Sequence, residues 1–119
     1  KESNTEAWIS LMRQECKDKN IRFAILMHPY EMQINKAGVI KWSTAGIAIP
    51  EDVLGIKTHL IMEEFSEEEG ILFFDIVPDL RSYTGNEHLF IEGDYGHYDV
   101  MGHTIIGKYL AEEISRIIK

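Results

Sequence analysis

Two apolar runs, each closed by a proline, constrain the fold of this chain more than any other feature. The first is nearly continuously apolar from Ile21 to Met27, with Arg22 as its one charged residue, and the second is apolar from Ile71 to Val77 apart from Asp75. Runs of this kind predict strands buried on both faces of a parallel sheet. Two such strands cannot form a self-sufficient sheet, because each leaves an open edge. We expect the missing strands to come from residues outside this sequence or from a second chain. That second chain could be another copy of this one, in a homodimer.

Helical patterns alternate with these two strands. A potential capping box from Ser3 to Glu6 predicts an amphipathic helix over 4–19, and a second helix is expected from Pro50 to Gly70. Asp99 can cap a third helix that continues to about Ile118. The order helix, strand, helix, strand, helix is typical of a parallel α/β layer with right-handed crossovers.

The apolar residues of each helical pattern predict its buried face. The expected faces are Trp8, Leu11, Met12 and Cys16; then Val53, Leu54, Leu60, Ile61 and Phe65; then Ile105, Ile106, Tyr109, Leu110, Ile114 and Ile117. Segment 31–48 has no sustained period, and it predicts an irregular excursion with a short extended piece over 39–42. Segment 79–88 is expected to be a polar connector. Within these elements, His59 and His88 are expected to face solvent, and the buried Asp75 needs a partner.

Composition limits the classes of partner. The chain has 119 residues and a formal charge of -8, which suits one acidic domain and argues against nucleic acid or an anionic membrane surface. No apolar run approaches the ~20 residues of a membrane span. The single cysteine, Cys16, excludes a disulfide within the chain and leaves the compartment open. The chain begins at Lys1 rather than Met, and we expect it to be part of a longer protein.

The stretch EGDYGHYDVMGH, residues 92–103, contains the candidate chemistry. Asp94 and His97 are three residues apart with Gly96 between them, so a turn can let the carboxylate accept the Nδ1 hydrogen of the imidazole. Nε2 of His97 would then face outward as a general base. The alternative is a purely structural role, in which Asp94 only closes a turn and His97 packs near a helix start.

Three further residues extend the possibilities around this stretch. Together with Asp94 and His97, Asp99 and His103 could ligate a metal, but the six-residue separation of the two histidines makes a metal site the weaker interpretation. His103 is expected in the first turn of the last helix. His28, after the first strand, either lines a substrate pocket or is satisfied at the strand end, and Trp42 either shapes such a pocket or belongs to the core.

The block that starts at Asp94-Tyr95-Gly96-His97 and continues through Asp99, Gly102 and His103 into an apolar helix resembles the last conserved block of the SGNH, or GDSL, hydrolases and their acetyltransferase relatives. The resemblance implies a three-layer α/β/α sandwich of flavodoxin-like type with a five-stranded parallel sheet, of which residues 1–119 would be the carboxyl-terminal segment. It also implies that His97 and Asp94 are two members of a serine esterase triad, with no cofactor and no metal.

The chain departs from that family at several places. Asp99 stands where the family commonly has Asn, and Tyr95 stands where Gly is frequent. None of the six serines lies in a Gly-Asp-Ser turn, and the blocks that supply the family's oxyanion hole are absent. We therefore expect the chain to be inactive alone, as part of an enzyme acting on a small-molecule or carbohydrate ester. The alternative is a non-catalytic α/β module for binding or assembly.

Overall fold

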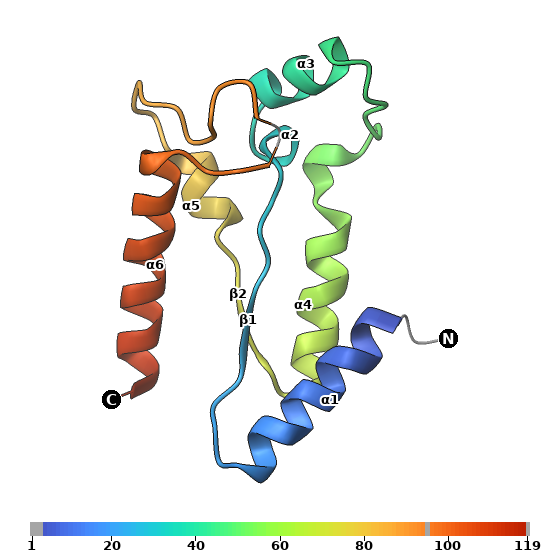
Figure 1. Cartoon of the computed structure of the whole chain (residues 1–119), viewed down its shortest axis with the longest axis vertical. Coiled ribbons are helices and arrows are strands. Elements are labelled where there is room, and N and C mark those ends of the chain that lie inside the picture. Colours follow the sequence, from blue (N-terminus) through green and yellow to red (C-terminus); the bar gives the residue numbers. More distant parts are fainter. Residues whose placement is uncertain (1–3, 95, 119) are drawn as a thin grey trace. The chain divides into compact units, whose positions relative to one another are not determined.

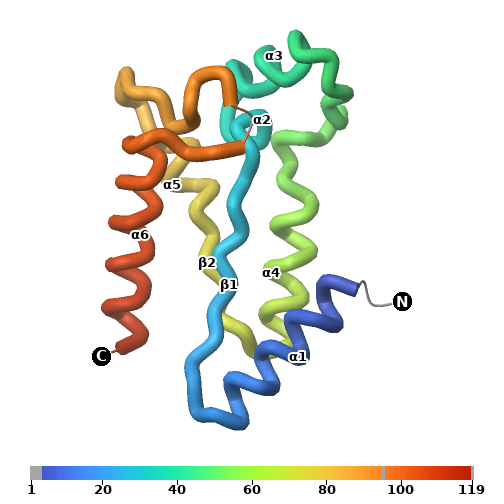
Figure 2. The backbone as a smooth tube through the Cα atoms, in the orientation of Figure 1, coloured from blue at the N-terminus to red at the C-terminus, as the bar shows by residue number. Residues whose placement is uncertain are grey.

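The computed structural model describes residues 4–94 and 96–118, which form a mixture of helices and one parallel strand pair (Figures 1 and 2). The chain divides into two compact units. The first contains α1 (Asn4–Asp18), β1 (Ala24–Leu26), α4 (Lys57–Glu69) from Thr58 onward, and β2 (Leu72–Phe74). The second contains all remaining elements, which are described separately below. No helix in the described ranges is both long enough and apolar enough to cross a membrane.

The first unit repeats one helix-to-strand connection. After α1, the Ile21 N–H donates to the Cys16 carbonyl at 2.8 Å, and Asn20 adopts a left-handed φ of 56°. After α4, the Ile71 N–H donates to the Ser66 carbonyl at 2.7 Å, and Gly70 has φ 64°. Both are Schellman caps, which satisfy the last helical carbonyls and turn the chain into the following strand.

The strands pair in parallel, as the sequence predicts, with Ala24 opposite Leu72 and Leu26 opposite Phe74. They are much shorter than the predicted strands over 21–27 and 71–77, because Ile21 and Ile71 belong to the caps. Burial on both faces was also a wrong expectation, since Ala24 and Leu72 are exposed. A two-strand sheet has too few neighbours to cover both faces.

The prediction for the buried face of α1 is wrong for three of its four residues. Trp8 is 67% exposed, and Leu11 and Met12 are exposed as well, whereas Ile9 is buried and Cys16 is half-buried. The cap explains which side of α1 is buried. The chain leaves the helix over Cys16, and Ile9, seven positions earlier, lies on the same side of the helix. Trp8, Leu11 and Met12 therefore lie outside the unit's core.

The cap likewise decides the buried side of α4, and of the residues expected to be buried in this helix only Phe65 is half-buried. His59 was expected to face solvent but is only 2% exposed, and Ser66 is fully buried, whereas Leu60 and Ile61 are exposed. Ser66 holds the cap to Ile71, and His59 lies seven residues before it on the same side. The expected helix from Pro50 is also interrupted, because Ile56 adopts a left-handed φ of 49° before α4 begins.

The second unit contains more helix than the sequence predicts. Its elements are α2 (Glu31–Ile34), α3 (Lys36–Thr44), the 3-10 turn η1 (Val53–Gly55), α5 (Val77–Ser82) and α6 (Val100–Ile118). The predictions of an irregular excursion over 31–48 and of an extended piece over 39–42 are therefore wrong, because α2 and α3 occupy most of this segment. Asn35 caps α3 by accepting the Gly38 N–H at 2.7 Å, and a Cβ at Gly38 would overlap the Glu31 backbone. The elbow between α2 and α3 thus requires glycine.

The helix α5 corrects two further predictions. It replaces the end of the predicted second strand and the first part of the predicted connector 79–88. Asp75 accepts the Val77 N–H at 2.9 Å, which supplies the partner that this acid needs. Pro78 lies in the first turn of α5, a position that requires no amide hydrogen, so it starts a helix rather than only ending a strand. Val77 and Leu80 then enter the core of the unit.

The long helix α6 agrees well with its prediction. Ile106 is buried and Ile105, Tyr109, Leu110 and Ile117 are half-buried, although Ile114 is exposed. At its start, Gly102 lies against the Leu89 carbonyl and the Tyr98 ring, where an added Cβ would overlap both. This close approach packs the first turn of α6 against the segment that carries the candidate site.

Candidate active site

The candidate residues lie on a short closed loop between Phe90 and Tyr98, which form an isolated antiparallel bridge. The Ile91 N–H donates to the His97 carbonyl at 3.0 Å, and the Asp94 N–H donates to the Ile91 carbonyl at 3.1 Å. Gly93 adopts φ 80°, a left-handed conformation that favours glycine. Tyr95 lies outside the described residues. The backbone therefore brings Asp94 and His97 to the same side of one loop.

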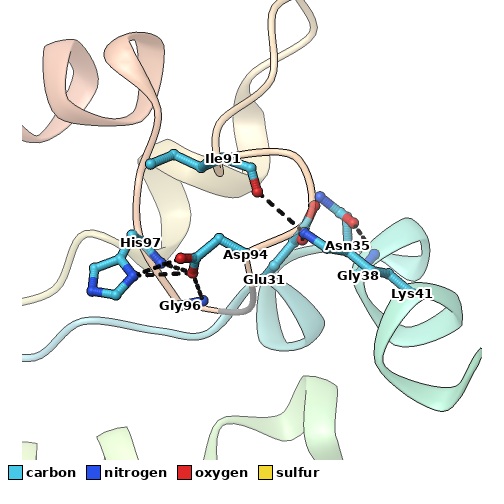
Figure 3. A network of polar contacts seen from close by, with 8 residues as sticks. All are labelled: Glu31, Asn35, Gly38, Lys41, Ile91, Asp94, Gly96 and His97. Carbon is cyan, nitrogen blue, oxygen red and sulfur yellow. Dashed lines mark hydrogen bonds and ion pairs between the residues drawn. The ribbon is translucent and has the colours of Figure 1, made fainter. Parts of the chain in front are cut away.

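Asp94 and His97 make the contact that their spacing predicts (Figure 3). His97 Nδ1 lies 2.9 Å from Oδ2 and 3.0 Å from Oδ1 of Asp94. Asp94 Oδ1 also accepts the backbone N–H of Gly96 at 2.8 Å and of His97 at 3.0 Å. The carboxylate thus orients the imidazole and closes the turn at once.

Electrostatics fixes the proton of this pair. The Gly96 amide, then the His97 imidazole and the His97 amide, lower the pKa of Asp94 to about 2. The carboxylate is therefore ionised at neutral pH and can only accept hydrogen bonds, which assigns a proton to Nδ1. In the neutral ring Nε2 is then the acceptor, as a general base requires.

The pair faces solvent. The His97 side chain is 79% exposed and that of Asp94 is 36% exposed. No hydroxyl of the residues in 4–94 and 96–118 hydrogen-bonds to His97 Nε2; Ser82 and Ser115 instead donate to carbonyls of their own helices. Both loop amides beside the ring already donate to Asp94. The described part of the chain thus provides a base and its orienter without a nucleophile or free oxyanion donors at the same place.

Tyr98 links the loop to two of the other histidines. Its ring lies 5.5 Å from that of His28 and 5.9 Å from that of His103, and its hydroxyl donates to the Pro29 carbonyl at 3.3 Å. Burial raises the pKa of Tyr98 to about 12, which keeps the phenol neutral. His28 is exposed beside this ring, so its role toward substrate stays a prediction.

The arrangement gives Asp99 and His103 structural roles. Asp99 accepts the Val100 N–H at 2.7 Å, and its carbonyl accepts the His103 N–H at 3.0 Å, which places His103 in the first turn of α6 as predicted. Among the residues that the structure describes, no three potential ligands gather closely enough to hold a metal ion. His88 is exposed on its connector, also as predicted.

Sequence reasoning missed the residues that connect this loop to the helices. Lys41 Nζ forms an ion pair with Glu31 Oε2 at 2.7 Å and donates to the Ile91 carbonyl at 3.4 Å (Figure 3). Trp42 is half-buried and packs edge-on against Tyr30, with ring centroids 5.3 Å apart. No local pattern points to a lysine 50 residues before the carbonyl that it binds. The only available signal is the Asn35 cap, which could have revealed α3.

Comparison of the chain with protein-family models, with curated proteins and with solved structures finds no match. The resemblance to the SGNH hydrolases therefore depends on the motif within residues 89–110.

Proposed function

We propose that Asp94 and His97 are the base and orienter of a serine esterase or acetyl-transfer enzyme of SGNH type, acting on a small-molecule or carbohydrate ester. The observation that carries the proposal is the hydrogen bond from His97 Nδ1 to an ionised Asp94, which leaves Nε2 available in the neutral ring. The serine and the oxyanion donors would come from outside the 119 residues. His28, beside Tyr98, is the candidate for contact with substrate.

The proposed chemistry assigns each proton. His97 Nε2 removes the hydroxyl proton of the serine as its oxygen attacks the ester carbonyl, and Asp94 stabilises the imidazolium that forms. The imidazolium then gives this proton to the departing alkoxide, leaving an acyl-enzyme. A water or sugar hydroxyl attacks the acyl group while His97 accepts its proton and returns it to the serine oxygen. External amide donors would stabilise the oxyanion at both steps.

The proposal includes the fold in which the pair would operate. We propose that the chain is the carboxyl-terminal part of a three-layer α/β/α sandwich. The parallel pairing of β1 with β2 supports this, as does the open edge that each of these three-residue strands retains. Additional parallel strands, from a preceding segment or a second chain, would complete the sheet.

Hydrolysis of p-nitrophenyl acetate by the full-length protein tests the catalytic role. We expect His97→Ala to lower kcat by roughly 10⁴-fold or more, because loss of the base removes the proton transfer in both steps. His88→Ala is the matched control, since His88 is an exposed histidine of the same unit outside the loop. Unchanged turnover in His97→Ala would disprove the assignment.

Asp94→Asn tests the orienting role separately. The amide oxygen can still accept the Gly96 and His97 N–H groups, but the side chain loses its charge and can present N–H to the ring. We expect the Nδ1 proton to move to Nε2, which ¹⁵N shifts of the imidazole report, and kcat to fall by roughly 10⁴-fold. Retention of both the tautomer and the rate would exclude Asp94 from the mechanism.

A second candidate is a non-catalytic module for binding or assembly. It is favoured by the absence of a hydroxyl at His97 Nε2 among the described residues, and by the use of the Gly96 and His97 amides to close the Asp94 turn. A module should be monomeric and melt cooperatively as these 119 residues. An enzyme segment should instead dimerise through its open strand edge or behave as a loose, aggregating species. Analytical ultracentrifugation and calorimetry distinguish the two.

A further inference from the structure

Ile91 connects the candidate loop to α3. Its N–H donates to the His97 carbonyl, and its own carbonyl accepts the Asp94 N–H. The same carbonyl also accepts a hydrogen bond from Lys41 Nζ, which belongs to α3. The backbone of Ile91 therefore contacts both members of the pair, and its carbonyl also contacts a cation from a distant part of the sequence (Figure 3).

The Lys41 ammonium is held in place from its other side. Glu31 Oε2 lies 2.7 Å from Nζ, and the two side chains are only 25% and 16% exposed, so water screens this ion pair less than a surface pair. Glu31 begins α2, and the elbow between α2 and α3 is closed by the Asn35 cap on Gly38. Lys41 thus extends toward Ile91 from a helix whose start is fixed by the Asn35 cap, and its ammonium group is held by Glu31.

We propose that Lys41, oriented by Glu31, is a positioning residue that keeps the Asp94–His97 pair in working geometry. The catalytic part of this inference depends on the proposed function. Lys41 acts through the Ile91 carbonyl, to which its Nζ donates a hydrogen bond while Glu31 holds the same ammonium. The Tyr98 end of the loop is held by its own backbone bonds, by the Tyr98 hydroxyl on Pro29 and by the packing of α6, whereas the imidazole is largely exposed. A misplacement of about 1 Å can reduce a catalytic rate by about 10²-fold, so such an anchor has a direct kinetic consequence.

Amide hydrogen exchange in the full chain tests the anchor without any assay of activity. In Lys41→Met we expect exchange at Ile91 and Asp94 to accelerate about tenfold, the factor that corresponds to one charged hydrogen bond. Exchange at Ile106 in α6 should not change. Lys36→Met is the matched control, because Lys36 is an exposed lysine of the same helix. Equal loop exchange in Lys41→Met and Lys36→Met would overturn the proposal.

Two further variants separate positioning from general stability. Lys41→Met leaves the Glu31 carboxylate buried without this partner, whereas the double variant Lys41→Met with Glu31→Met removes both charges. We expect the double variant to recover thermal stability but to retain the faster exchange at Asp94. Lys41→Arg should restore slow exchange, since it keeps a donor cation. Recovery of slow exchange in the double variant would contradict the anchor.

Kinetics of the full-length protein then test the catalytic consequence. We expect Lys41→Met to lower kcat for p-nitrophenyl acetate by about 10-fold to 10²-fold with KM unchanged, and Lys41→Arg to restore it. If His97→Ala abolishes activity but Lys41→Met does not alter kcat, the positioning role fails while the proposed function stands. If His97→Ala has no effect, the proposed function fails, and loop exchange alone decides whether Lys41 anchors the loop.

Discussion

The helix-to-strand connections of the first unit and the candidate loop of the second solve the same problem by different means. After α1 and α4, carbonyls in the last helical turn are satisfied by backbone amides at Ile21 and Ile71. In the loop, the Gly96 and His97 amides are satisfied by the side chain of Asp94, and the Ile91 carbonyl by Lys41. Backbone caps depend on local conformation, whereas these contacts of the loop depend on charged side chains. The two regions should therefore fail under different perturbations.

The largest expected effect concerns the close packing that supports the loop. Gly102→Ala should lower the free energy of unfolding by about 1–3 kcal/mol, because its Cβ would overlap the Leu89 carbonyl and the Tyr98 ring. Gly107→Ala, in the same helix with open space around it, should raise stability by roughly 0.5–1 kcal/mol. Urea denaturation measures both values. Equal signs for the two variants would show that α6 does not pack on the loop in this way.

A smaller loss is expected from the backbone caps. Gly70→Ala places a Cβ on a left-handed residue and should cost about 1–2 kcal/mol. Asn20→Gly, at the equivalent position after α1, should be tolerated, because glycine adopts the same φ freely. Thermal unfolding of the two variants provides the comparison. Similar losses in both would mean that left-handed φ is not what these caps require.

The smallest effect concerns pH and should appear in the loop alone. The pKa of Asp94 is lowered from 3.8 to about 2, so its contribution to loop order is present above pH 4 and disappears as the pH falls through 2. The ¹³Cγ shift of Asp94 and the Gly96 amide shift should titrate together near pH 2. In His97→Ala the midpoint should rise but stay below 3.8, because the Gly96 amide is the largest cause. A midpoint near 4 in the unmodified chain would contradict the turn geometry.

Sequence patterns predicted long, strongly periodic elements better than short ones. The helices near 4–18 and 100–118 agree with their predictions because their apolar signals repeat over many residues, and the parallel pairing agrees because helical patterns alternate with the two apolar runs. The short helix α3 was missed since its residues lack a sustained apolar period, and its start depends on the Asn35 cap. Near the start of α5, the apolar pattern around Asp75 favours a strand that Pro78 ends, although a proline in a first turn equally predicts a helix start.

The candidate site shows the same division. The contact between Asp94 and His97 was predicted because the two residues are only three positions apart and Gly96 between them allows a turn. The burial of His59 could not be predicted from apolar periodicity, since the cap at Ser66 decided which side of α4 faces the core. Which side of a helix is buried depends on how the chain leaves the helix as well as on where its apolar residues lie.

By itself the sequence determined the local chemistry: a carboxylate and an imidazole at turn spacing, two apolar strands, and the cap residues Asn20 and Gly70. Such features form within a few residues, so the entropy of closing long loops hardly enters. Only the tertiary structure decided that Lys41 reaches Ile91, 50 residues along the chain, and that Trp8 lies outside the core. These outcomes depend on competing packing arrangements between distant segments, and the local pattern does not rank those arrangements.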